Sequence, residues 1–185
     1  PMRHAGGSVL TFNGEIYNYV ELRRDLAASG VSVSSSGDTE VLLAALATWG
    51  PEQTLRRVRG MYAFAWYDPQ SGNLWLARDP IGKKPLYVAD DGRQLVFSST
   101  LEAILLWRRS QGAGALTVDP VAVEHFLACG YISAPRTIFV GVEKLQAQQW
   151  RCVGPDSERS GHFQPVPFAN GAGAALGPAT LDGLQ

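Results

Sequence analysis

A continuous apolar run at residues 61–66 places the strongest constraint on how this chain folds. The run holds three aromatic residues and no alternation of apolar with polar side chains, so both faces of the predicted strand must be buried. Turn residues follow at 68–72, and a second apolar run follows at 74–77, which together predict a hairpin. A hairpin of this kind needs a covering layer on each side.

Helical spacing before the hairpin predicts one such layer. Residues 18–29 predict a helix that has Asn18 and Glu21 as a capping-box pair and Gly30 just after its end. Residues 38–49 predict a second helix with Asp38 at its N-cap. The interior of this second helix is apolar on every face, so the helix must be covered all round.

The remaining pattern adds short strands and two more helices. We expect strands at residues 8–12, 85–89, 94–98 and 137–142, helices at 100–107 and 119–129, and a late strand that carries Cys152. Antiparallel hairpins with helices outside them predict an α+β layered sandwich.

Composition excludes several classes of protein. The 185 residues carry 16 basic and 17 acidic side chains, which gives no basic excess for nucleic acid. The apolar runs are too short to span a bilayer, so we expect no membrane contact. The two cysteines, Cys129 and Cys152, form neither a disulfide framework nor a zinc motif, and we expect no metal or other cofactor in this chain. A reduced, cytoplasmic setting is the default expectation.

The densest polar cluster is Asn13-Gly14-Glu15, directly after the first strand. An Asn amide beside a Gly N–H is the donor pair that an oxyanion hole requires. Glu15 could bind a cation such as an α-amino group, and Asp38 could share that cation. The alternative is purely structural: Asn and Gly favour strand ends and turns, and Asp38 suits a helix cap.

Arg78 and Asp79 stand at the end of a predicted strand. They could be catalytic, but we favour a structural ion pair because buried charges are usually paired. No Ser or Cys near a His forms a recognisable nucleophile motif. The sequence therefore supplies candidate groups for an oxyanion hole and for binding an amino group, but no candidate nucleophile.

Five segments together resemble the glutaminase domain of glutamine-hydrolysing asparagine synthetases. These segments are residues 12–18 (FNGEIYN), 37–43 (GDTEVLL), 59–65 (RGMYAFA), 77–87 (ARDPIGKKPLY) and 130–139 (GYISAPRTIF). They come in the family's order and spacing, and the resemblance covers residues 1 to about 168. Other class II amidotransferases share the Asn-Gly and Asp-Thr-Glu elements but not the full set.

The resemblance implies an N-terminal-nucleophile hydrolase fold, an αββα sandwich of two antiparallel sheets. It also implies that an N-terminal Cys attacks the glutamine amide and that ammonia passes to a C-terminal synthetase domain, where ATP and Mg²⁺ activate aspartate. By position, Asn13 and Gly14 would form the oxyanion hole, Glu15 and Asp38 would hold the glutamine α-amino group, and Met61 would line the ammonia path. Arg78 and Asp79 keep their structural interpretation.

The chain begins Pro-Met-Arg-His and lacks the family's Met-Cys-Gly start. We therefore expect a fragment: a partial glutaminase domain at residues 1–168, incomplete at its N-terminus, then an Ala/Gly-rich linker at 169–185 towards a synthetase domain of the same polypeptide. Without its nucleophile, the fragment alone should be inactive. Two alternatives stay open: a non-catalytic domain that binds an amino acid or a partner, and an amidotransferase with another acceptor, as in polysaccharide biosynthesis. A homodimer also stays open.

Overall fold

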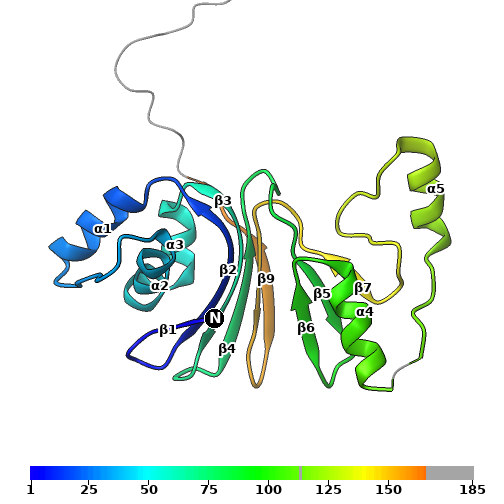
Figure 1. Ribbon diagram of the computed structural model, residues 1–185, viewed down its shortest axis with the longest axis horizontal. Coiled ribbons are helices and arrows are strands. Elements are labelled where there is room, and N and C mark those ends of the chain that lie inside the picture. Colours follow the sequence, from blue (N-terminus) through cyan, green and yellow to red (C-terminus); the bar gives the residue numbers. More distant parts are fainter. Residues whose placement is uncertain (113, 166–185) are drawn as a thin grey trace, which may run out of the picture.

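The computed structural model describes residues 1–112 and 114–165, which form two antiparallel β-sheets stacked face to face (Figure 1). The strands are β1 (Met2–Arg3), β2 (Val9–Ile16), β3 (Gly60–Asp68), β4 (Asn73–Arg78), β5 (Tyr87–Asp90), β6 (Leu95–Ser98), β7 (Val142–Lys144), β8 (Gln149–Val153) and β9 (Glu158–His162). The larger sheet has the order β1-β2-β3-β4-β8-β9, and the smaller has the order β6-β5-β7. Helices cover the two outer faces, which confirms the predicted α+β sandwich.

β3 lies in the middle of the larger sheet and is buried on both faces, as the apolar run predicts. Tyr62, Phe64 and Trp66 pack into the core beneath the helices of that side. Ala63 and Ala65 face the other way, into a second core that includes side chains of the smaller sheet. The small alanine side chains suit a face where a second sheet packs closely.

Three helices, α1 (Tyr19–Ala28), α2 (Asp38–Trp49) and α3 (Pro51–Arg57), cover the outer face of the larger sheet (Figure 1). α2 lies deepest: its six residues from 41 to 46 are all buried, as its uniformly apolar interior predicts. α3 is not among the predicted elements. It begins at Pro51, directly after Gly50. The backbone turns between α2 and α3 at Gly50, which has a φ of 77°.

The other two helices belong to the side of the smaller sheet. α4 (Leu101–Ser110) packs against it and begins at Thr100, whose side chain accepts a hydrogen bond from the Ala103 N–H at 3.4 Å. α5 (Pro120–Cys129) begins at Asp119, whose carboxylate accepts a hydrogen bond from the Val121 N–H at 3.0 Å. α5 stands apart from both sheets (Figure 1). Both helices match the predicted segments.

Two expectations about strands need correction, and one strand was not predicted. The strand predicted at residues 8–12 continues to Ile16, because its backbone stays paired with β3 as far as Gly60. The strand predicted at 137–142 begins only at Val142, because Phe139 makes just an isolated bridge with Val118. The late strand at Cys152 is β8, and it pairs with β9, which was not predicted. The predicted boundary at 168 and the linker at 169–185 lie outside the described residues.

Candidate functional site

Gly14 allows β2 and β3 to approach each other closely. In the register of the two strands Gly14 lies opposite Tyr62, and Glu15 lies opposite Met61. A Cβ atom on Gly14 would lie 2.7 Å from the Cα of Tyr62 and would also collide with the Met61 carbonyl oxygen. The absence of a side chain at Gly14 therefore lets β3 pack closely against β2, and does not serve only to let a ligand reach the backbone.

Alternation along β2 places Asn13 and Glu15 on one face of the sheet. This is the face opposite to Leu10 and Ile16, which are buried beneath the helices. Both polar side chains are exposed, and within the described residues the Asn13 amide makes no hydrogen bond to protein. The amide is thus free to donate to a bound group.

Asp38 joins the start of α2 to the end of β2. Gly37, rather than Asp38, occupies the N-cap position, and Asp38 is the first helical residue. One carboxylate oxygen, Oδ2, accepts a hydrogen bond from the Ile16 N–H at 2.8 Å, and Thr39 Oγ1 donates to the other, Oδ1, at 3.3 Å. The N-terminus of α2 carries positive dipole charge that favours a carboxylate there.

A cavity of about 520 Å³ lies where these segments meet. Its walls come from the end of β2, the start of α1, the start of α2 and the start of β3: Gly14, Glu15, Ile16, Tyr17, Tyr19, Ser36, Gly37, Asp38 and Met61. We call it the β2–α2 cavity. Two carboxylates, Glu15 and Asp38, and no Lys or Arg line it among the described residues, so its walls favour a cationic group.

The structure thus brings four of the predicted site residues to one cavity: Gly14, Glu15, Asp38 and Met61. Asn13 does not line it. Its side chain lines a neighbouring cavity of about 280 Å³ between the two sheets, which Ala63 and Phe97 also line. The adjoining Asn13 and Gly14 therefore stand at the boundary between the two cavities.

Asn18 is buried beside the segment that lines the cavity, and its role differs from the helix cap that the sequence predicts. It precedes α1, yet its side chain makes no capping hydrogen bond to that helix. Its amide nitrogen donates to the Arg57 carbonyl at 3.0 Å, and its amide oxygen accepts from the Arg59 N–H at 2.8 Å. Asn18 thereby ties the start of α1 to the start of β3. The predicted capping partner, Glu21, instead lies 3.7 Å from Arg59.

Arg78 and Asp79 organise the connection from the larger sheet to the smaller one. Arg78 donates from Nε to the Lys84 carbonyl at 2.7 Å and from Nη1 to the Leu145 carbonyl at 2.6 Å. Asp79 is fully buried and accepts hydrogen bonds from the backbone N–H groups of Ile81, Lys83 and Lys84. Among the described residues these two side chains do not pair with each other.

Burial lowers the pKa of Arg78, and the nearby Asp79 charge opposes that shift. The carbonyl oxygens around Arg78 compensate for the loss of water. These contacts support a structural role for Arg78 and Asp79, although the two residues act on backbone groups rather than as an ion pair.

Neither cysteine lies at the β2–α2 cavity. Cys152 is buried in the helix-side core, and this burial raises its pKa; Cys129 is exposed on α5. No group of three or more His, Cys, Asp or Glu side chains suited to a metal ion occurs within residues 1–112 and 114–165. Over the same residues, no helix has the length and apolar character needed to cross a membrane.

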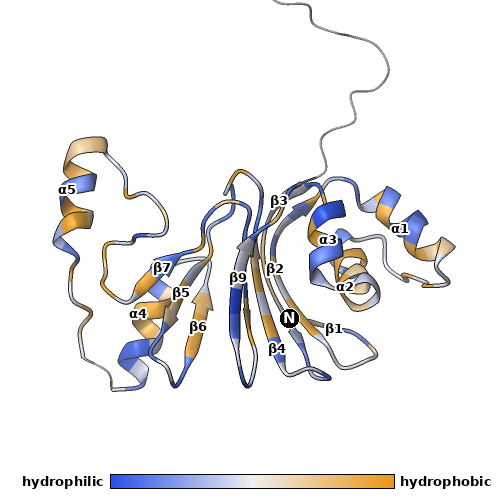
Figure 2. Cartoon of the chain, turned by 180° about the vertical axis from the view of Figure 1, so that it is seen from behind, coloured by the Kyte–Doolittle hydropathy of each residue, from blue (hydrophilic) through white to orange (hydrophobic). Residues whose placement is uncertain are grey.

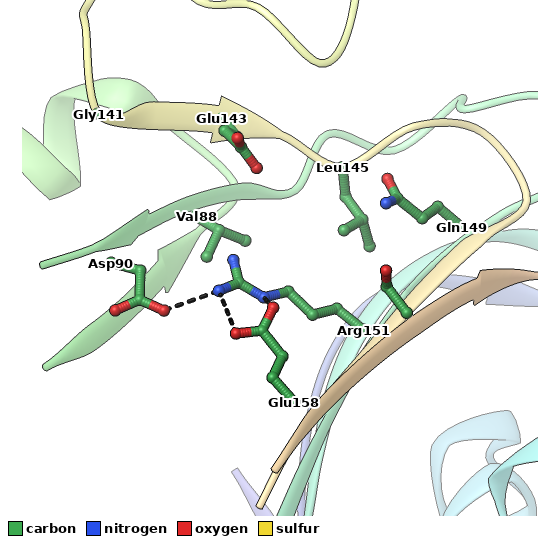
Figure 3. A pocket seen from close by; sticks show the side chains of 9 residues that line it. Val88, Asp90, Gly141, Glu143, Leu145, Gln149, Arg151 and Glu158 are labelled. Carbon is green, nitrogen blue, oxygen red and sulfur yellow. Dashed lines mark hydrogen bonds and ion pairs between the residues drawn. The ribbon is translucent and has the colours of Figure 1, made fainter. Parts of the chain in front are cut away.

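A third cavity, of about 310 Å³, opens between β8–β9 and β5–β7 (Figure 3). Arg151 reaches across it: its Nη2 lies 2.7 Å from an Asp90 oxygen, and its Nε lies 2.6 Å from an oxygen of Glu158. Asp90 belongs to the smaller sheet and Arg151 to the larger, so this ion pair links the two layers at the open side of the sandwich.

Comparison with known proteins identifies relatives of this chain. The chain is 39% identical over 140 residues to a Mycobacterium tuberculosis protein named provisionally as a glutamine-hydrolysing asparagine synthetase, an overlap of 75% of this chain and 21% of that protein. It is 32% identical over 163 residues to the glutamine-hydrolysing asparagine synthetase 1 of Bacillus subtilis, an overlap of 85% and 25%. The chain thus spans about a quarter or less of the length of these relatives.

The fold is also that of a solved amidotransferase. The structure matches the glutamine phosphoribosylpyrophosphate amidotransferase of Bacillus subtilis with a TM-score of 0.58, over 88% of this chain and 30% of that one, at 20% identity. The two proteins therefore share the sandwich fold. Residues 1–164 match the family described as the glutamine amidotransferase domain, and the chain belongs to that family.

Proposed function

We propose that this chain is the glutamine-binding part of an asparagine synthetase-like amidotransferase, and that the β2–α2 cavity receives the glutamine. The observation that carries the proposal is the meeting of Glu15 and Asp38 at one cavity beside Asn13-Gly14. Two carboxylates at one cavity suit the α-ammonium of an amino acid. The adjoining donors suit the carbonyl oxygen of a side-chain amide.

In the proposed reaction, a cysteine thiolate from outside this chain attacks the carbonyl carbon of the glutamine side-chain amide. The Asn13 amide and the Gly14 N–H would donate to the oxyanion that forms. The tetrahedral intermediate then collapses and its C–N bond breaks. The leaving nitrogen takes up the proton that the thiol gave up on forming the thiolate, and departs as ammonia. Water hydrolyses the resulting thioester to glutamate and restores the thiol.

The ammonia would leave past Met61, which lines the cavity beside Glu15. The acceptor would be aspartate, activated by ATP with Mg²⁺ in a synthetase domain of the same polypeptide. Support for this step comes from the names and the greater length of the relatives.

A second function, amino-acid binding without hydrolysis, is favoured by one observation. The described residues around the cavity supply both carboxylates but no cysteine. A chain with binding groups and no nucleophile would bind glutamine and leave it intact.

Measurement of ammonia release separates the two functions. The purified 185-residue chain should release no ammonia from glutamine above the blank, whereas a form extended at its N-terminus by its native upstream residues should release ammonia at a measurable rate. In the extended form, Glu15→Gln should lower kcat/KM while the exposed, distant Glu102→Gln leaves it unchanged. An extended form that binds glutamine but never hydrolyses it would overturn the enzymatic proposal in favour of the second function.

A further inference from the structure

The loop between α1 and α2 forms one wall of the β2–α2 cavity. The two helices lie side by side on the outer face of the larger sheet, and residues 29–37 connect them (Figure 2). The last four residues of this loop, 34–37 (SSSG), are all exposed and carry no apolar side chain. Ser36 and Gly37 line the cavity, directly before Asp38. Burial of apolar side chains therefore does not hold the part of the loop that faces the cavity.

Hydrogen bonds to Glu40 hold this exposed segment instead. The N–H and the hydroxyl of Ser34 both donate to Oε1 of Glu40 at 2.9 Å, and the Ser35 N–H donates to Oε2 at 2.6 Å. Hydrogen bonds from Ser35 and Ser34 lower the pKa of Glu40 to about 2, so the carboxylate is ionised at neutral pH and its bonds are charge-assisted. From α1, Arg23 donates from Nη2 to the Ser35 carbonyl oxygen. The segment is thus tied to both neighbouring helices.

The bonds of Glu40 differ from those of an ordinary helix cap. Glu40 is the third residue of α2, the position from which the glutamate of a capping box accepts a bond from the N–H of the N-cap residue. The N-cap here is Gly37, and its N–H donates to Ser35 Oγ at 3.3 Å instead. Glu40 binds the two residues that lie further back along the chain. Its carboxylate therefore shapes the loop rather than the end of the helix.

The cavity-lining residues lie inside the stretch of chain that these bonds enclose. Between the bonded serines and Glu40 the chain includes Ser36, Gly37 and Asp38, all three of which line the cavity. Asp38 is also held from the other side, because its Oδ2 accepts the bond from the Ile16 N–H at 2.8 Å. The bond to Ile16 fixes the side chain of Asp38, and the bonds to Glu40 fix the backbone that leads into it.

We propose that Glu40 is a positioning residue for glutamine binding, which holds residues 36–38 so that the Asp38 carboxylate meets the α-ammonium of the ligand. This inference rests on the proposed function, because it takes glutamine to be the ligand of the β2–α2 cavity. Glu40 does not line the cavity and acts through Asp38. Without Glu40, the exposed loop has to be ordered when the ligand binds, and that ordering lowers the affinity.

Substrate preference in the form extended by its native upstream residues tests this role. Glu40→Gln should lower the ratio of kcat/KM for L-glutamine to that for 4-carbamoylbutanoate, which lacks the α-amine, by about threefold or more. KM for glutamine should rise while kcat stays within about twofold of the original, because the α-ammonium is bound alike in ground and transition states. The ratio does not depend on the fraction of folded protein, so a merely destabilising substitution leaves it unchanged.

A matched control makes the same change in the first turn of another helix. Glu102 is exposed at the start of α4, and Glu102→Gln should leave the ratio unchanged. An unchanged ratio in E40Q, or an equal fall in E102Q, would overturn the proposal. An unmodified extended form that shows no preference for glutamine would contradict the proposed function itself, and this inference with it.

Two further variants test the route through Asp38 and cover the case in which E40Q does not fold. Ser34→Ala removes one of the three bonds to Glu40 and retains the Ser34 N–H, so the ratio should fall by about twofold. In a background of Asp38→Asn, E40Q should cause little further fall, because two residues that act as a unit are not additive. An unchanged ratio in S34A, or a fall in the D38N background as large as in the original, would overturn the positioning role.

Discussion

The Oδ2 atom of Asp38 accepts a hydrogen bond of 2.8 Å from the backbone N–H of Ile16. This contact joins the first turn of α2 to the end of β2, one residue after Glu15. The hydrogen bond that Asp38 makes therefore fixes the position of its own carboxylate relative to that of Glu15. Asp38 therefore has two separable roles, one in anchoring the helix and one in supplying negative charge.

Substitution at Asp38 should separate these roles. Asp38→Asn retains an oxygen acceptor for the Ile16 N–H, so its unfolding free energy should stay within about 1 kcal/mol of the original. Asp38→Ala removes the acceptor and should lose about 2 kcal/mol, because the bond is made to a charged group. Urea unfolding of both variants measures this difference. Equal stability of D38N and D38A would contradict the anchoring role.

Acid should remove the stabilisation that Glu40 provides. Hydrogen bonds from Ser35 and Ser34 lower the pKa of Glu40 from 4.5 to about 2. The folded state thus favours the carboxylate, so the stabilisation is complete above pH 4.5 and is lost as the pH falls towards 2. Unfolding curves of the original chain and of Glu40→Gln should converge in stability across this window. A constant difference between them from pH 5 to pH 2 would contradict the assignment.

Removal of the Tyr62 hydroxyl should stabilise the fold. Tyr62 is fully buried in the helix-side core, and its hydroxyl has no hydrogen-bond partner among the described residues. Burial, with a smaller effect of the Asp79 charge, raises its pKa, so the group stays neutral but unsatisfied. Tyr62→Phe should gain about 1 kcal/mol in thermal or urea unfolding. The partly exposed Tyr67→Phe should change stability by less than about 0.5 kcal/mol. A loss of stability in Y62F would show that the hydroxyl has a partner.

Arg78 should be intolerant even of lysine. Its guanidinium donates to the carbonyl oxygens of Gly82 and Lys84 in the loop after β4, and to that of Leu145, 67 residues further along the chain. A lysine ammonium cannot reach all three with the same planar geometry. Arg78→Lys should cost about 2 kcal/mol or more of unfolding free energy, and the exposed Arg93→Lys almost nothing. Similar small effects at both positions would contradict the organising role.

The sequence predicts the elements whose pattern is local and strong. The run at 61–66 has no polar interruption, and α2 is apolar all round, so both β3 and α2 lie where expected. β9 reads Glu-Arg-Ser-Gly-His, without apolar alternation, and it forms because its backbone pairs with β8 at the sheet edge. No local pattern reveals such an edge strand.

The candidate site is likewise predicted only where its residues form a local pattern. Glu15 and Asp38 are identified from the sequence as a pair, but the bond between Asp38 and the Ile16 N–H joins residues 22 positions apart and follows only from tertiary packing. For the same reason, the role of Asn18 at the start of β3 could not be predicted. The continuation of β2 through Gly14 depends on the register with β3, which the turn-forming character of Asn-Gly conceals.

The most direct test of the account is whether Glu15 and Asp38 recognise an amino group. Isothermal titration calorimetry of a glutamine-binding form of the protein should compare L-glutamine with 4-carbamoylbutanoate, the same molecule without its α-amine. The account predicts that the amine-free compound binds at least about tenfold more weakly, and that Glu15→Gln removes most of this difference. Equal affinity for the two compounds, or an unchanged preference in E15Q, would contradict the claim that the β2–α2 cavity holds the glutamine α-ammonium.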